Sequence, residues 1–110
     1  MGDFRKLKVS QESMDLCEEV YLLTQNEKYS KDFELRGQTR KSSISIPSNI
    51  AEGEKSGSNK QSIRYFNIAK ASCAELQTQL IIAYRIKYIS KNEFLPVEDL
   101  CKRFHQCYIT

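Results

Sequence analysis

The chain has 110 residues, of which 40% are hydrophobic and 28% are charged, and its formal net charge is +3. This length allows one domain with one core and excludes two. The most apolar run, Leu80 to Ile89, is about half of the roughly 20 residues that a membrane span needs, and it contains Arg85 and Lys87. Because the N-terminus also lacks the apolar region of a secretory signal, we expect a cytoplasmic protein.

The scarcity of turn residues, two prolines and four glycines, favours helices over a β-sandwich. Residues 1–8 are predicted to form a short basic segment that precedes the first helix. A first helix is predicted over residues 10–25, because Ser10 fits an N-cap and the acids at Glu12 and Asp15 suit the dipole of the first turns. Its apolar stripe comprises Val9, Leu16, Val20 and Leu23. Residues 26–30 are polar and predict a loop.

The second predicted helix, residues 32–52, contains a local conflict. Residues 41–47 alternate polar and apolar side chains, which alone would indicate a strand. Gly37 and Pro47 each disfavour a helix, by roughly 1 and 3 kcal/mol. A lone strand would have no partner, however, and the apolar residues also recur at steps of three and four. We therefore predict a helix that is kinked at Pro47 and ended by Gly53.

The third predicted helix, residues 59–88, has the clearest pattern. It follows a polar loop at 53–58, and Ser58 with Gln61 fits a capping box. Apolar side chains recur at helical spacing at Phe66, Ala69, Cys73, Leu76, Leu80 and Ala83. A short fourth helix is predicted over residues 96–108, with Pro96 in its first turn. The chain is thus predicted to be all-α.

The C-terminal third of the 59–88 helix is apolar on nearly every side. A helix of this kind must be covered on nearly every side, and three short companions from the same chain can hardly do so. Either this end lies deep in the core or a second subunit packs on it. We predict the subunit contact, because monomers rarely expose such surface. The predicted interface residues are Ile81, Tyr84, Ile86, Tyr88 and Ile89.

Charge is unevenly distributed along the chain. Residues 9–26 carry acidic side chains and no cation, whereas residues 59–88 carry five cations and the single acid Glu75. This pattern can steer partners, although two oppositely charged neighbouring helices would look the same. Cations spaced by one helical turn predict contacts with nucleic-acid phosphates, and a solvated helix face is the alternative. The predicted nucleic-acid-binding residues are Arg36, Arg40, Lys41, Lys60 and Arg64.

The cysteines and the one histidine do not indicate catalysis. Cys101, His105 and Cys107 could suggest a metal site, but no C-x-x-C pair is present, so we predict reduced thiols with no metal and no cofactor. No serine or acid is placed to form a relay with His105. Glycines 53 and 57 lack the lysine of a phosphate-binding loop. We therefore predict that the protein is not an enzyme.

Specific motifs resemble a known family. The run S-I-P-S-N-I-A-E-G at residues 45–53, I-R-Y-F at 63–66 and E-L-Q-T-Q-L at 75–80 are similar to the four-helix-bundle family of 23S ribosomal RNA intervening-sequence proteins. The segments F-R-K-L-K-V at 4–9 and Q-T-R-K-S at 38–42 resemble that family as well, so the resemblance covers essentially the whole chain. Two departures are Ser10, where the family usually has tryptophan, and Lys41, where a small residue is usual.

This resemblance implies an up-and-down four-helix bundle that assembles as a homopentamer and whose biochemical role is poorly defined. It also implies a relation to the accessory variability determinant of diversity-generating retroelements, whose members are basic pentamers that bind a reverse transcriptase and nucleic acid. Within the family motif, we hypothesise that Asn49 and Glu52 brace the 53–58 turn or a subunit contact, with simple helix termination as the alternative. Two functions remain open: nucleic-acid binding through the basic faces, and docking of a partner protein on the acidic first helix or the apolar helix end.

Overall fold

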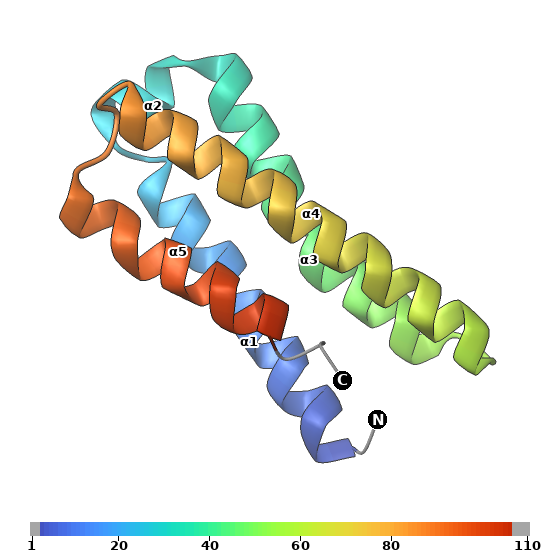
Figure 1. Cartoon of the computed structure of the whole chain (residues 1–110). Helices are drawn as coiled ribbons and strands as arrows, with labels where there is room; N and C mark the ends of the chain where they lie inside the picture. Colours follow the sequence, from blue (N-terminus) through green and yellow to red (C-terminus); the bar gives the residue numbers. More distant parts are fainter. Residues whose placement is uncertain (1–2, 107–110) are drawn as a thin grey trace.

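The computed structural model describes the backbone of residues 3–106 and the side chains of residues 7–106. It is all-α, as predicted, with helices α1 (Asp3–Leu23), α2 (Glu27–Lys31), α3 (Phe33–Lys55), α4 (Asn59–Arg85) and α5 (Lys91–Gln106). The four long helices contact one another in the cyclic order α1, α3, α4, α5, which is an up-and-down bundle (Figure 1). No strand occurs within residues 3–106.

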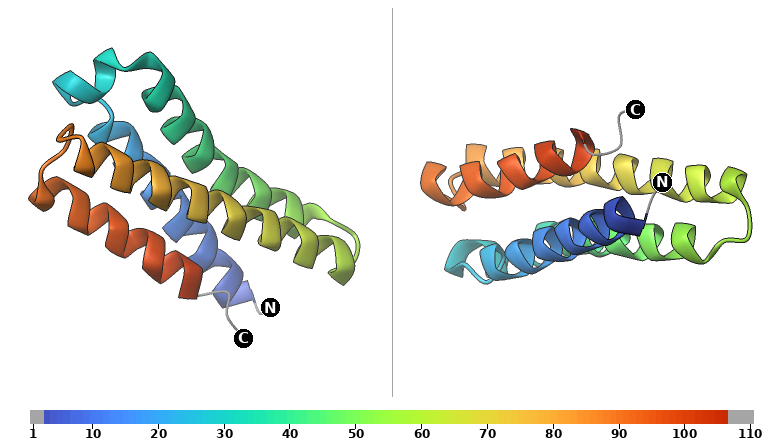
Figure 2. Two further views of the ribbon diagram at one scale, coloured as in Figure 1. Left: turned by 45° about the horizontal axis from the view of Figure 1, so that its top comes forward. Right: turned by 90° about the horizontal axis from the view of Figure 1, so that it is seen from below.

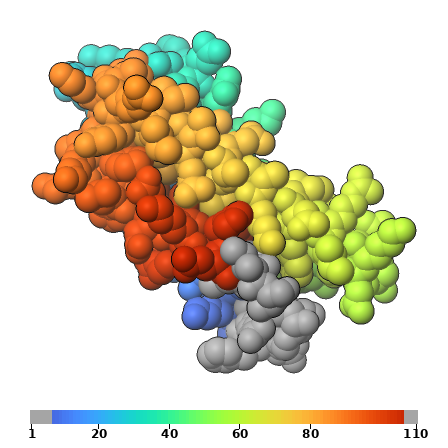
Figure 3. All heavy atoms as spheres, viewed as in Figure 1, coloured from blue at the N-terminus to red at the C-terminus, as the bar shows by residue number. Residues whose placement is uncertain are grey.

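The long helices form two layers, with α4 and α5 in one and α1 and α3 in the other (Figure 2). The α3–α4 hairpin is longer than the α1–α5 pair, because α4 alone has 27 residues and therefore spans about 40 Å. The turn that joins α3 to α4 consequently projects beyond the rest of the bundle, at the yellow-green end of the molecule in Figure 3. This protruding end is called the hairpin tip below and comprises residues 52–64.

The core lies between the two layers and is built from the predicted apolar stripes. Each long helix contributes side chains that are fully or almost fully buried, for example Leu16, Ile46, Leu76 and Phe104. All members of the stripe predicted on the first helix are buried, as are most of those predicted on the third. Helical periodicity therefore identified the core-facing side of the first and third predicted helices.

Helix α1 begins at Asp3, so the prediction of a non-helical lead-in and an N-cap at Ser10 was wrong. Nothing between residues 3 and 10 breaks a helix, and Ser10 lies inside α1. The hydroxyl of Ser13 donates to the carbonyl of Ser10 (2.8 Å), as serines inside helices often do with the preceding turn. Glu12, Asp15, Glu18 and Glu19 consequently lie in the middle and C-terminal turns of α1.

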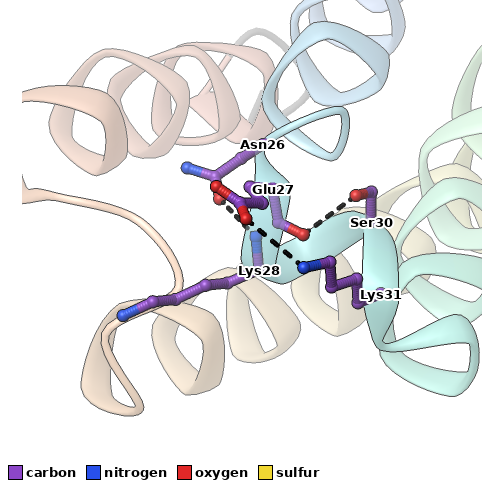
Figure 4. Close-up of polar contacts among 5 residues, drawn as sticks. All are labelled: Asn26, Glu27, Lys28, Ser30 and Lys31. Carbon is purple, nitrogen blue, oxygen red and sulfur yellow. Dashed lines mark hydrogen bonds and ion pairs between the residues drawn. The ribbon is translucent and has the colours of Figure 1, made fainter.

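Residues 26–30, predicted as a loop, contain most of the short helix α2. Asn26 caps it, since its side-chain oxygen accepts a hydrogen bond from the Lys28 backbone N–H (3.0 Å, Figure 4). The hydroxyl of Ser30 donates to the Glu27 carbonyl, and Lys31 pairs with the Glu27 carboxylate at 3.3 Å (Figure 4). These local contacts are short-range and polar, and no apolar periodicity could have predicted them.

Helix α3 continues through Pro47, so the choice of helix over strand for residues 41–47 was correct. It ends at Lys55, two residues past Gly53. Gly53 does not end the helix; it allows α4 to approach. A Cβ at this position would lie 3.3 Å from the Tyr65 Cβ and 3.4 Å from the Ser62 carbonyl oxygen. The Gly53 carbonyl accepts hydrogen bonds from the Ser56 and Ser62 hydroxyls, which closes the hairpin.

The other two boundaries also differ from the predictions. Helix α4 ends at Arg85 because Lys87 adopts a left-handed conformation (φ 68°), and the N–H of Tyr88 bonds to the carbonyl of Ala83 (2.9 Å) in a Schellman motif. Helix α5 begins at Lys91, not at Pro96. Ser90 and Glu93 form a reciprocal capping box there, with side-chain to backbone N–H distances of 3.1 and 2.9 Å.

Candidate functional site

The predicted cationic residues do not form one patch. Arg36 and Arg40 lie on α3 and are held by contacts within the chain. The Arg36 guanidinium donates to the Ser30 carbonyl at 2.8 Å and lies 4.8 Å from the centre of the Phe33 ring. Arg40 donates to the buried Thr24 hydroxyl, also at 2.8 Å, and stacks on the ring of Tyr21. Both arginines are only half-exposed, so much of their hydrogen-bonding capacity is used in joining α3 to its neighbours.

Lys41 is exposed and lies on a different side of α3, at a polar groove that runs between α3 and α4. The groove measures about 360 Å³ and also contains Glu75 and Gln79 of α4. Ser45 and Ser72 share a 2.8 Å hydrogen bond across it. Among the described residues, the buried Oε1 atom of Gln79 has no hydrogen-bond partner. The atom is buried, so a group from outside the chain reaches it only if the groove opens.

Lys60 and Arg64 are exposed on the first turns of α4, at the hairpin tip. The predicted cap is present, since the Ser58 side chain accepts from the Gln61 N–H at 3.2 Å. Neither Lys60 nor Arg64 takes part in an ion pair within residues 7–106. Of the predicted cations, these two are the ones that the fold leaves free at a protruding end.

A further group of cations lies at the opposite end of the bundle and was not predicted. A groove of about 760 Å³ between α2 and the α4–α5 turn is lined in part by Lys28, Arg85 and Lys87. The Lys28 side chain extends away from the other labelled residues of α2 (Figure 4). Glu93 also lines the groove, and the Ser90 N–H holds the pKa of its carboxyl below its usual value, so it stays ionised and offsets part of the positive charge.

The predicted interface residues divide into two groups. Ile81 and Ile86 are 40% and 49% exposed, and Tyr84 is 37% exposed while its ring stacks on Phe94 at 4.7 Å. Ile89, in contrast, is 3% exposed and belongs to the core of its own chain. Both it and Tyr88 follow the Schellman turn, which the sequence prediction had assigned to the helix, and this turn directs them inward.

Tyr88 is half-buried and forms part of a polar network between the α4–α5 turn and the start of α3. Its hydroxyl donates to the Asp32 carboxylate at 2.9 Å, which raises the pKa of Tyr88. Asp32 also caps α3 through the Leu35 N–H, and that bond, followed by the one from Tyr88, holds the pKa of Asp32 below its usual value. Beside this pair, burial raises the pKa of Tyr29, whose hydroxyl bonds to Thr39 at 2.7 Å. This network therefore holds the α4–α5 turn against the start of α3.

The exposed apolar surface is broader than predicted. Ile82 is 43% and Ile68 38% exposed, and helical spacing places both with Ile86 on the side of α4 that borders the α3–α4 groove. Ala71 is exposed between them. We call these four residues, Ile68, Ala71, Ile82 and Ile86, the α4 apolar stripe. The polar Glu75 and Gln79 lie on the same side between Ala71 and Ile82, and Ile86 directly follows the last residue of α4. The sequence contained this signal in the all-round apolar character of α4, but the side that remains uncovered depends on where α3 and α5 pack.

Two of the cysteines, Cys73 and Cys101, lie in the core. Cys73 and Cys101 are fully buried, and the Cys73 thiol donates to the Cys101 carbonyl at 3.5 Å. The hydrogen bond with Cys73 and the burial of the site raise the pKa of the Cys101 thiol, which keeps it protonated. Cys107, the third member of the sequence motif considered for a metal, lies outside the described residues. No group of three metal-ligating side chains occurs within the described part of the chain.

Comparison with known proteins identifies the family. The family model described as "23S rRNA-intervening sequence protein" matches residues 5–109. The chain belongs to this family. The fold is similar to the crystal structure of a protein with unknown function from the S23 ribosomal protein family of Bacteroides thetaiotaomicron VPI-5482, with a TM-score of 0.86, 23% identity, and coverage of 94% of this chain and 93% of that one. No curated protein matches the chain.

The motif that identifies this 23S rRNA-intervening sequence protein serves packing. In the S-I-P-S-N-I-A-E-G run, Ile46 and Ile50 are buried and Gly53 is the point of closest approach to α4. Asn49 donates to the carbonyl and hydroxyl of Ser45, at 2.7 and 3.0 Å, so the hypothesis that it braces the 53–58 turn is wrong. Glu52 is exposed. The motif therefore builds the α3–α4 hairpin, and no described part of it forms a catalytic arrangement.

In the described residues, no helix is both long and apolar enough to cross a membrane.

Proposed function

We propose that this 23S rRNA-intervening sequence protein is a non-enzymatic module that assembles into a ring, as a homopentamer, and contacts the phosphate backbone of nucleic acid through the hairpin tip. The observation that carries the proposal is the combination of an uncovered apolar stripe along α4 with free cations at the protruding end of the same helix. We also propose the cytoplasm as its compartment, since the three described cysteines are free thiols.

Assembly is supported by the α4 apolar stripe. The three isoleucines of this stripe are each more than a third exposed and lie on one side of one helix, whereas single scattered apolar residues would need no explanation. The adjacent α3–α4 groove adds the exposed polar side chains of Lys41 and Glu75 beside this stripe. Apolar area and polar groups able to contact a second chain thus lie on one face.

A ring, in contrast to a two-fold dimer, requires two different faces on each chain that fit each other. A second exposed apolar set lies on α3, on the side turned away from the α3–α4 groove. Phe33 is 71% and Ile44 is 44% exposed, and they stand about three helical turns apart with the exposed Gly37 between them. Packing of this face on the α4 apolar stripe of a neighbour would be heterologous, which is the kind of contact that forms a ring when the rotation between neighbours closes.

Nucleic-acid contact is supported by geometry more than by total charge, because +3 is modest. Lys60 and Arg64 lie one turn apart on the same side of α4 and have no ion pair in the described structure. Each copy in a ring would present one such tip, and simultaneous contacts of several tips raise the apparent affinity without new interactions. Arg36 and Arg40 contribute less, since internal contacts hold them.

The test is a titration of a fluorescein-labelled single-stranded RNA and a DNA duplex of mixed sequence at low salt. The double variant K60E/R64E should bind at least tenfold more weakly and show a smaller salt dependence, because each lost phosphate contact removes about 0.7–0.9 from the logarithmic salt slope. The matched control is K31E/K102E, which changes net charge equally but alters cations already paired with Glu27 and Glu98 at 3.3 Å. Equal losses in both variants, or no binding by the unaltered protein, would contradict the nucleic-acid part of the proposal.

A further inference from the structure

The face of the bundle opposite the α3–α4 groove carries a second groove, between α1 and α5. It measures about 530 Å³, and three apolar side chains form part of its lining. Leu22 is 60% exposed, Pro96 is exposed and Leu100 is half-buried. These side chains come from two helices and meet in one concave strip, so they form a connected apolar surface and not scattered residues.

The rim of this groove is acidic. Asp15, Glu18 and Glu19 on α1 and Asp99 on α5 line it, and all four are exposed. Arg103 is the one cation among the lining residues, and it pairs with Asp99 at 3.1 Å. The three α1 carboxylates take part in no ion pair within residues 7–106. The groove therefore combines an apolar strip with a strongly negative α1 edge.

The sequence had left open whether the acids of α1 simply attract a basic neighbouring helix. In the cyclic order of the bundle, α1 packs between α3 and α5, whereas the basic helix α4 lies diagonally across from it. Asp15 to Glu19 consequently point along the α5 side, where Asp99 adds another carboxylate. Asp15, Glu18 and Glu19 take part in no ion pair within residues 7–106, so these three carboxylates are available to a partner.

We propose that the α1–α5 groove docks a basic amphipathic helix of a partner protein. An apolar strip with charged edges selects a helix whose apolar side chains recur at steps of three and four and are flanked by lysine or arginine. Antiparallel packing places Leu22 beside Pro96 and Asp15 near Arg103, so the strip runs about 10 Å along the bundle and fits two turns of such a helix. The same carboxylates repel nucleic acid and anionic membranes, which excludes both as occupants.

This docking site is independent of the proposed assembly and of the nucleic-acid contact. The groove lies on the opposite side of the four-helix ring from the α3–α4 groove, and it remains uncovered when neighbours pack on α3 and α4. Opposite faces of the protein would then hold a nucleic acid at the hairpin tip and a basic partner at the α1–α5 groove.

The experiment uses the full chain and a synthetic 18-residue peptide probe, labelled with fluorescein, with a leucine stripe flanked by lysines. Fluorescence anisotropy should show saturable binding that weakens with salt. A peptide of identical composition, with the leucines redistributed around the helix, should bind at least tenfold more weakly, because its charge is retained but its apolar face is lost. Equal binding of the two peptides would overturn the proposal, since it would indicate charge attraction without a groove.

Two protein variants locate the site. E18K/E19K should weaken binding of the amphipathic peptide at least tenfold, whereas E52K/E54K, an equal charge change at exposed positions of the hairpin tip, should change it less than twofold. L22A keeps the charge and should still weaken binding several-fold. Equal effects of the two double variants would overturn the proposal. In sedimentation experiments, E18K/E19K should have the same assembly state as the unaltered protein. Dissociation of this variant would assign the groove to a second copy of the chain and overturn the partner assignment.

Discussion

The close approach of α3 and α4 at Gly53 makes a prediction with a defined sign. Replacing Gly53 with alanine adds a Cβ at 3.3 Å from both the Tyr65 Cβ and a ring carbon of Phe66, and at 3.4 Å from the Ser62 carbonyl. The Tyr65 and Ser62 atoms belong to or adjoin the α4 backbone and cannot rotate away. The two helices must therefore separate locally, which would also lengthen the hydrogen bond from the Ser62 hydroxyl to the Gly53 carbonyl.

The magnitude follows from two opposing effects. Alanine in place of glycine inside a helix stabilises by roughly 0.5–1 kcal/mol. Overpacking at a contact that cannot relax costs about 1–3 kcal/mol. We expect G53A to lower the free energy of unfolding by about 1–2 kcal/mol. At Gly37, apart from the adjoining residues and the backbone of α3 itself, no atom of the described structure lies within 4 Å of the position that a Cβ would take. G37A should therefore raise the free energy of unfolding of the single chain by about 1 kcal/mol.

The assay is urea unfolding followed by circular dichroism at 222 nm, at one fixed protein concentration because assembly adds to apparent stability. The two alanine variants act as controls for each other, since both make the same chemical change inside α3. A G53A protein as stable as the unaltered chain would refute the tight hairpin. Gly37 lies on the α3 face that the proposed ring would cover, so a destabilised G37A protein would indicate that a neighbouring chain packs against this position.

Three other perturbations test separate parts of the structure. K87G should raise the free energy of unfolding by about 1 kcal/mol in the same urea assay, because glycine removes the strain of a left-handed residue at the end of α4; a loss would contradict the Schellman turn. Above the ordinary carboxyl pKa of 3.8, the unaltered chain should be more stable than D32N by a constant amount. This difference should disappear as pH falls below that value, because the folded pKa of Asp32 is lowered. A difference that grows on acidification would contradict the sign of this shift. I82E/I86E should shift the assembly to single chains in size-exclusion chromatography without loss of helical signal, and unchanged size would contradict the proposed subunit face.

The parts of the fold that depend on periodicity could be predicted from sequence. The stripes on α1 and α4 identified the core residues because burial follows the 3.6-residue helical repeat. For α3, the alternating 41–47 segment competed with a helix, and the absence of a partner strand decided correctly. The resemblance of residues 45–53 to the 23S rRNA-intervening sequence family agreed with that choice.

Helix ends were predicted less well, because they depend on single hydrogen bonds. The Ser90–Glu93 capping box was present in the sequence, yet Pro96 gave a stronger local signal and misplaced the start of α5. A left-handed residue at a helix end is usually glycine, so the lysine at position 87 gave no signal of the turn in the sequence. The same error placed Ile89 among the interface residues, since continuing the helix past Arg85 turned a core side chain outward.

The sequence identified which residues the candidate sites contain, but not which of them lie together on one surface. The five cations named from sequence lie in three separate places, since Arg36 and Arg40 bond within the chain while Lys41 and the hairpin tip point elsewhere. The acidic character of α1 was visible in the sequence. That its carboxylates meet apolar side chains of α5 depends on which helix packs beside α1, and only the tertiary structure shows this.

The most direct measurement is the molar mass of the intact protein by sedimentation equilibrium over a wide concentration range. Ring assembly through the uncovered faces of α3 and α4 predicts one species of about five times the 12.8 kDa chain mass, independent of concentration. A single species of 12.8 kDa at every concentration would contradict the assembly on which the proposed function depends.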